Sequence, residues 1–132
     1  MARLDRLLIM DDVESIFAVP TKIAHALGYV TIETALTLEE AISKMTQVEM
    51  RIFADLQMLP DHNDAAIQLY AIFTGMGGNP LNFAVNSGAL TRHQDESDEI
   101  ELRAMLREKC PGAMQVPKND SLLMQQFLKR EV

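Results

Sequence analysis

The sequence is poor in the residues and segments that mark several protein classes. Its one cysteine, Cys110, cannot form an internal disulfide, and no apolar run approaches the roughly 20 residues that span a bilayer. Only six glycines and five prolines occur among 132 residues, which excludes a collagen-like or low-complexity chain. The segment from Met1 to Asp12 reaches two carboxylates after a short apolar stretch and has no small-residue cleavage site, so we expect no secretory signal. These absences favour the cytosol.

Positive charge is also in short supply. The chain has 12 lysines and arginines against 19 aspartates and glutamates, for a net charge of −7. The basic residues lie in scattered pairs, so we expect no direct binding of nucleic acid. What the sequence does have is a 48% apolar share over a length that suits one domain with a buried core. An acidic cleft in such a domain would attract a divalent cation.

Short apolar runs typical of buried strands alternate with segments of helical period along the whole chain. Gly28 closes the first helical segment, with Pro20 expected in its first turn, and Thr37 followed by Glu40 opens the second as a capping box. Five strands and five helices in strict alternation predict an α/β domain, a parallel sheet between two helical layers. The first predicted strand ends at Met10, and the other four span residues 29–34, 50–54, 81–85 and 113–116. A helix is expected over residues 99–109, and we assign Ile100, Leu102, Met105 and Leu106 to its buried face.

Polar residues of particular kinds follow these predicted strands. Asp11 and Asp12 follow the first strand, Asp55 follows the third, Ser87 follows the fourth and Lys118 follows the fifth. Because ligands of such sheets bind outside the carboxyl ends of the strands, we expect these side chains to share one edge. Three carboxylates there would repel one another, and a hard cation such as Mg²⁺ removes that difficulty. The edge can then carry a phosphoryl group on Asp55, since a carboxylate can attack phosphorus.

This ordered set of residues resembles the receiver domain of two-component response regulators, over essentially the whole chain. No single piece is specific, and the ordered combination at four strand ends carries the resemblance. It implies a flavodoxin-like, doubly wound sheet of five parallel strands in the order 2-1-3-4-5 with five helices, an order taken from the family. It also implies a single receiver domain over residues 1–132 with no output domain. The matching pieces are residues 7–12, 52–58 and 85–88, and Gly112-Ala113 leading to Pro117-Lys118.

The resemblance implies a role for each residue at this edge. Asp55 would be the phosphoacceptor, taking its phosphoryl group from a sensor histidine kinase or a histidine phosphotransfer protein. Ser87 would hydrogen-bond one phosphoryl oxygen, and Lys118 would pair with another. The implied ligands of Mg²⁺ are Asp12 and Asp55 directly, Asp11 mostly through water, and the backbone carbonyl of Gln57.

The expected function is therefore a stand-alone, cytoplasmic, phosphorylation-controlled switch. It would be no enzyme apart from catalysing its own phosphorylation and dephosphorylation. Phosphorylation would draw Ser87 inward and change a surface formed by the fourth strand, the fourth helix and the fifth strand. Output would pass through a downstream protein target that the sequence does not identify, with no membrane involved and a homodimer left open.

Four departures from the family pattern keep a second interpretation open. Lys118 follows Pro117 instead of preceding a proline, the loop after Asp55 is one residue longer, the stretch from Ser87 to Lys118 is also longer, and no aromatic residue stands near Gln115. The order of Pro117 and Lys118 and the altered loops favour a pseudo-receiver, in which the same fold is an interaction or dimerisation module that works without phosphorylation.

Two further classes fit the first strand end poorly. A phosphatase of the haloacid dehalogenase type needs two aspartates spaced by one residue, whereas Asp11 and Asp12 are adjacent. A flavin or nucleotide binder needs glycines and backbone N–H groups where this loop offers carboxylates.

Overall fold

The computed structural model describes residues 5–56, 64–88, 90, 97–118 and 120–130 of the chain. Its five strands form one parallel sheet in the order β2-β1-β3-β4-β5, which confirms the predicted α/β fold and the strand order. The strands are β1 (Arg6–Met10), β2 (Thr31–Ala35), β3 (Arg51–Asp55), β4 (Phe83–Ser87) and β5 (Met114–Pro117).

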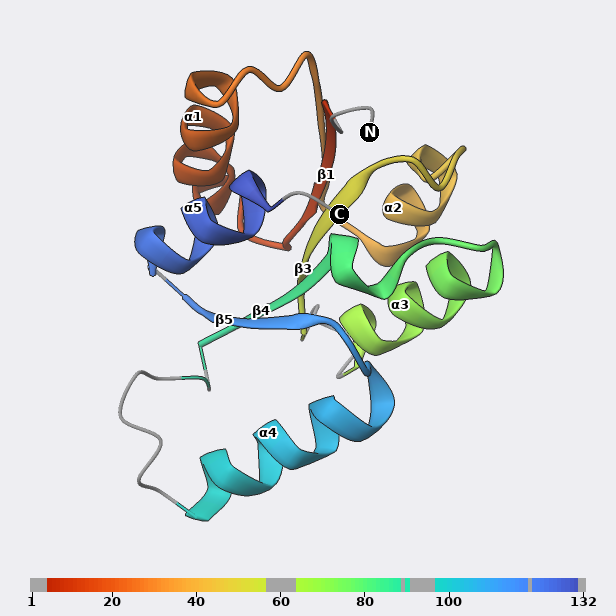
Figure 1. Cartoon of the computed structure of the whole chain (residues 1–132), viewed down its shortest axis with the longest axis vertical. Helices are drawn as coiled ribbons and strands as arrows, with labels where there is room; N and C mark the ends of the chain where they lie inside the picture. The colour runs from red at the N-terminus through yellow and green to blue at the C-terminus, as the bar shows by residue number, and fades with distance from the viewer. Residues whose placement is uncertain (1–4, 57–63, 89, 91–96, 119, 131–132) are drawn as a thin grey trace.

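Helices cover both faces of this sheet (Figure 1). Helices α1 and α5 pack against each other on one face, whereas α2, α3 and α4 cover the other. Within the described ranges, no helix is both long enough and apolar enough to cross a membrane. The helices are α1 (Ala18–Ala26), α2 (Leu38–Lys44), α3 (Ala65–Gly75), α4 (Ser97–Lys109) and α5 (Ser121–Lys129), with 3-10 turns η1 (Glu14–Phe17) and η2 (Pro80–Asn82).

Alternating side chains of the central strands fill two separate hydrophobic cores. In β1, Leu7 and Ile9 pack under α1 and α5, whereas Leu8 and Met10 pack under α2 and α3. All four are at most 1% exposed. Because both faces are covered, the strand is a continuous apolar run, and polar side chains enter only where the strand ends. The two cores thus determine where the buried apolar run of each central strand ends, and hence which polar residue comes first at the carboxyl edge of the sheet.

Several details of the sequence prediction are wrong. The second strand spans Thr31–Ala35 and not residues 29–34. The fourth strand begins at Phe83 and not at Leu81, because Pro80–Asn82 form η2, which Asn79 caps by accepting a hydrogen bond from the N–H of Leu81. Ile100 is 53% exposed and does not belong to the buried face of α4. Leu106 lies on the buried face. Ile100 precedes it by six residues, which in an α-helix places the two side chains about a third of a turn apart around the axis.

The capping box at the start of α2 gives a direct test of the local structure. The Thr37 hydroxyl accepts a hydrogen bond from the Glu40 N–H at 3.0 Å, and the Glu40 carboxylate accepts one from the Leu36 N–H at 3.0 Å. We expect Thr37→Ala to lower the free energy of unfolding by about 1 kcal/mol, because it leaves an N–H of the first turn without a partner. Ser43→Ala, which removes an exposed hydroxyl from the same helix, should cost much less in the same urea titration. Equal losses in the two variants would contradict this account.

Candidate functional site

Three carboxylates meet at the carboxyl edge of the sheet. Asp11 and Asp12 leave the sheet directly after β1, and Asp55 is the last residue of the neighbouring strand β3. One carboxylate oxygen from each residue lies within 4.8 Å of the other two. Two opposite ligands of Mg²⁺ lie about 4.2 Å apart, so carboxylate oxygens this close together can share one ion, either directly or through a water molecule. The donor set, all carboxylate oxygens, suits a hard divalent cation.

The Lys118 ammonium reaches the same carboxylates from the end of β5. Its Nζ forms an ion pair with Asp11 and lies 3.4 Å from Asp55 Oδ1. The preceding Pro117 therefore does not turn the lysine side chain away from the edge. The other Asp11 oxygen, Oδ1, accepts a hydrogen bond from the Val13 N–H at 2.9 Å, which fixes the orientation of that carboxylate.

Burial dominates the electrostatics of Asp55, which is 7% exposed. Loss of solvent is the main reason that the pKa of its carboxyl rises from 3.8 to about 6; Lys118 opposes this increase, and the charges of Asp11 and Asp12 contribute to it. With all three carboxylates ionised, the one ammonium leaves the cluster with a net charge of −2. The arrangement thus concentrates negative charge where a cation would be stabilised.

The end of β4 lies between the end of β3, which carries Asp55, and the end of β5, which precedes Lys118. Ser87 is 5% exposed and pairs in register with Pro117, and its backbone carbonyl accepts a hydrogen bond from the Lys118 N–H at 3.2 Å. Ser87 and Lys118 are therefore joined through their backbones, so a displacement of one loop acts on the other.

Asn86 is a residue that sequence reasoning missed. Its side chain is 1% exposed, and its amide nitrogen donates to the carbonyls of Val116 at 3.0 Å and Pro117 at 3.3 Å. These two carbonyls directly precede Lys118, so the Asn86 amide holds the strand end that carries the lysine. The sequence signal was a polar amide directly after the apolar run Phe83–Val85 and before Ser87.

The comparisons with known proteins decide the fold. No protein-family model and no curated protein matches the chain. Among solved structures, chemotaxis protein CheY4 of Vibrio cholerae matches with a TM-score of 0.71 and 14% identity, over 98% of this chain and 99% of that one. A CheY-like response regulator receiver domain protein from Methanospirillum hungatei matches with a TM-score of 0.65 and 20% identity, over 96% and 91%. The beryllofluoride-activated NtrC4 receiver domain dimer matches with a TM-score of 0.62 and 26% identity, over 95% and 97%. This chain has the CheY-like receiver fold.

One position of this receiver fold carries a polar clamp between β5 and α4. The Gln115 side-chain oxygen accepts a hydrogen bond from Arg103 Nη1 at 3.2 Å, and its amide nitrogen donates to the Arg103 carbonyl at 3.0 Å. The Arg103 guanidinium also donates to the buried Glu99 carboxylate at 2.9 Å. Where the family resemblance called for an aromatic residue, this chain thus connects the strand and the helix through hydrogen bonds.

Some predicted residues lie outside the part of the chain that the structure describes. Gln57, assigned above to the metal site through its backbone carbonyl, is one of them. The described members of the site are Asp11, Asp12, Asp55, Ser87 and Lys118, and their ends of β1, β3, β4 and β5 form one edge of the receiver fold.

The raised pKa of Asp55 predicts a pH-dependent stability difference. A carboxyl whose folded-state pKa is about 6 binds its proton more tightly than in the unfolded chain, where the value is 3.8. The stability that this proton contributes is present below pH 3.8 and is lost as the pH rises through 6. The Asp55→Asn variant has no carboxyl to ionise, so it does not lose stability in this way as the pH rises. Between pH 4 and pH 7.5 in the absence of metal, the stability of Asp55→Asn relative to wild type should therefore increase by about 2.5 kcal/mol.

Urea unfolding in a chelating buffer measures this difference, and Asp5→Asn, at an exposed position away from the cluster, is the matched control. If the advantage of Asp55→Asn is the same at both pH values, Asp55 is not held in the desolvated, acidic surroundings described here.

Proposed function

We propose that this chain is a phosphorylation-controlled receiver that accepts a phosphoryl group on Asp55 in a Mg²⁺-dependent reaction. The observation that carries this proposal is the cluster of Asp11, Asp12 and Asp55 at the carboxyl edge of a receiver fold, with the Lys118 ammonium against Asp11 and Asp55. A fold by itself does not specify a function, and this group of side chains supplies the chemistry. We also propose that residues 1–132 act as one receiver domain.

The three carboxylates are the residues that would hold Mg²⁺. Asp12 and Asp55 are the candidates for direct ligands, and the backbone carbonyl of Gln57 is a further candidate. Asp11 already pairs with Lys118 and accepts the Val13 N–H, so we assign it a contact through water. Bound there, the ion would supply positive charge to the oxygens of the phosphoryl group.

Asp55 is the nucleophile in the proposed reaction. One of its oxygens attacks the phosphorus of a phosphohistidine, a P–O bond forms, the P–N bond breaks, and the electron pair of that bond remains on the imidazole. A carboxyl pKa of about 6 leaves Asp55 ionised at neutral pH, as a nucleophile requires. Positioning and neutralisation of charge supply the rest of the catalysis, because phosphoryl transfer asks for little covalent chemistry from the protein. We therefore propose a regulatory domain that acts on itself, and not an enzyme with a separate substrate.

The switch we propose begins at Lys118. A phosphoryl group on Asp55 offers new oxygens to this ammonium and to the Ser87 hydroxyl, in competition with Asp11. Movement of Lys118 would act on Ser87 through their backbone hydrogen bond and on β5 directly. The Gln115–Arg103 clamp would then pass the displacement of β5 to α4, and with it to a partner-binding surface.

The partners we propose follow from this chemistry. A sensor histidine kinase or a histidine phosphotransfer protein, in the cytoplasm, would supply the phosphoryl group. A downstream protein would recognise the altered surface.

Intact mass spectrometry tests the phosphorylation directly. After incubation with Mg²⁺ and acetyl phosphate, we expect the wild-type chain to gain the mass of one phosphoryl group, and we expect none in Asp55→Asn or in excess chelator. Asp5→Asn is the control and should be labelled like the wild type. An unlabelled wild type, or a label that persists in Asp55→Asn, would defeat the proposal and leave the pseudo-receiver as the better interpretation.

The role of Lys118 gives a second test. We expect Lys118→Ala to bind Mg²⁺ at least as tightly as the wild type, because the variant removes a competing cation from Asp11 and Asp55. Its phosphorylated form should lack the conformational change of the wild type, since no ammonium contacts the new oxygens. Amide chemical shifts recorded during a Mg²⁺ titration, and before and after phosphorylation, measure both effects. Loss of Mg²⁺ binding in Lys118→Ala would show that the lysine supports the metal site, contrary to the role assigned here.

A further inference from the structure

Lys118 follows the end of a short strand at the edge of the sheet. β5 has four residues, Met114–Pro117, and lies beside β4. Its last residue, Pro117, pairs in register with Ser87 but has no N–H to donate. The next N–H, that of Lys118, donates to the Ser87 carbonyl at 3.2 Å. The strand end that carries the lysine thus has fewer backbone hydrogen bonds to the sheet than the end of a central strand, which is bonded on both sides.

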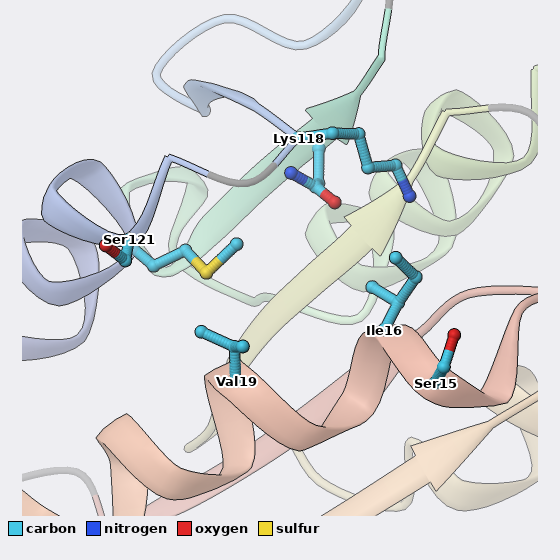
Figure 2. A pocket seen from close by; sticks show the side chains of 7 residues that line it. Ser15, Ile16, Val19, Lys118 and Ser121 are labelled. Carbon is cyan, nitrogen blue, oxygen red and sulfur yellow. The ribbon is translucent and has the colours of Figure 1, made fainter.

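The Lys118 side chain is not packed on all sides. A cavity of about 310 Å³ lies along it, and Figure 2 shows the lysine facing Ile16 and Val19, from η1 and α1, across this space. Its ammonium nevertheless forms an ion pair with Asp11 and lies 3.4 Å from Asp55 Oδ1. Because a lysine has a long and flexible stem, the position of this ammonium depends on how firmly its backbone is held.

The Asn86 side chain supplies further hydrogen bonds to this strand end. Its amide nitrogen donates to the carbonyls of Val116 at 3.0 Å and Pro117 at 3.3 Å, the two carbonyls that precede Lys118. The opposite orientation of the amide would turn its oxygen toward two other oxygens, so these contacts also define which end of the amide faces β5. The side chain of a β4 residue thus compensates for the donor that β5 lacks at Pro117.

Asn86 also connects this strand end to the segment that carries Asp55. It pairs in register with Asp55 of β3, and its backbone carbonyl accepts a hydrogen bond from the Leu56 N–H at 3.0 Å. One residue therefore contacts the carboxylate-bearing segment through its backbone and the ammonium-bearing segment through its side chain. The separation of Asp55 and Lys118 depends on both contacts.

The oxygen end of the Asn86 amide brings no such advantage. Oδ1 is buried and has no hydrogen-bond partner among the described residues, and a buried acceptor without a donor is unfavourable. Asn82, at the opposite end of β4, also has a buried Oδ1 without a partner in the described part of the chain. The unpaired oxygen is thus not peculiar to Asn86. Its position and its two donated hydrogen bonds distinguish it, and Asn82 is a matched control.

We propose that Asn86 is a positioning residue for Lys118, whose amide holds the end of β5 so that the ammonium stays against Asp11 and Asp55. Its side chain touches none of the reacting groups of the proposed phosphorylation and acts through the lysine. The consequence for the metal rests on the proposed function. An ammonium held in place competes with Mg²⁺ for these carboxylates, so a looser ammonium favours the ion.

Exchange of the Lys118 ammonium protons with water, measured by nuclear magnetic resonance in the metal-free chain, tests the proposal. The signal is assigned by its absence from Lys118→Ala. Asn86→Leu keeps the branched shape of the side chain and removes the donors. We expect it to accelerate the exchange by about fivefold, the factor that corresponds to one hydrogen bond. Asn82→Leu, the same change at the other end of β4, should leave the exchange unchanged.

Urea unfolding first establishes that each variant folds. If the leucine disturbs the sheet, Asn86→Ala takes its place, because it removes the donors without bringing methyl groups against the two carbonyls. Equal exchange in the wild type and in the folded Asn86 variant would overturn the proposal, and so would equal acceleration in Asn82→Leu.

The affinity for Mg²⁺, followed by amide chemical shifts, separates positioning from a purely structural role. We expect Asn86→Leu to bind Mg²⁺ at least about twofold more tightly than the wild type, whereas damage to the sheet edge would weaken binding. In the Lys118→Ala background the same change should have no effect, because no ammonium remains to be positioned. Weaker binding in Asn86→Leu, or an equal effect in both backgrounds, would overturn the proposal. Absence of Mg²⁺ binding in the wild type would count against the proposed function instead, and the ammonium exchange would still decide the role of Asn86.

Discussion

Repulsion among three carboxylates is the constraint on which the functional edge of this protein depends. Asp11, Asp12 and Asp55 are held within 4.8 Å of one another, and two of them are almost fully buried. Without a counter-charge such a group is unstable, and the raised pKa of Asp55, caused first by its burial and then by the charges of Asp11 and Asp12, reflects the cost of ionising it there. Lys118 relieves part of it by pairing with Asp11 and approaching Asp55. The remaining negative charge gives the edge its affinity for a cation.

The sheet holds the three carboxylates together because contacts away from the site determine the positions of its strands. Two hydrophobic cores, one on each face, determine the register of β1 against β3 and hence bring the last residues of both strands side by side. The stability that holds the carboxylates together comes from apolar burial away from the site. In many proteins the functional site lowers the stability, and the rest of the fold offsets that loss.

The fold and the strand ends were predictable from the sequence for a simple reason. Parallel strands that alternate with helices place their carboxyl ends at one edge, so the residues after each apolar run share a location even without knowledge of their contacts. That rule brought Asp11, Asp55 and Lys118 together from distant parts of the chain. The resemblance to receiver domains supplied the strand order, which alternation alone does not determine.

The details that escaped prediction depend on side-chain direction. Asn86 lies inside a strand, and the sequence does not say that its amide donates to the carbonyls of β5 while its oxygen remains without a partner. In the sequence, Gln115 stands out only because no aromatic residue lies near it. In the structure its side chain forms two hydrogen bonds with Arg103 of α4, twelve residues earlier, a contact that the sequence does not reveal. Ile100 was misassigned because Leu106 marks the buried face of α4, and a helix this polar has too few apolar residues for its buried face to be inferred from periodicity.

A crystal structure of the chain grown with Mg²⁺ tests the central claim most directly. The account predicts a single ion at this edge, about 2.1 Å from oxygens of Asp12 and Asp55 and joined to Asp11 through water, with the three carboxylates drawn closer than they are in the metal-free arrangement. An ion bound elsewhere, or an unchanged cluster at saturating Mg²⁺ in which Lys118 alone balances the carboxylates, would contradict it.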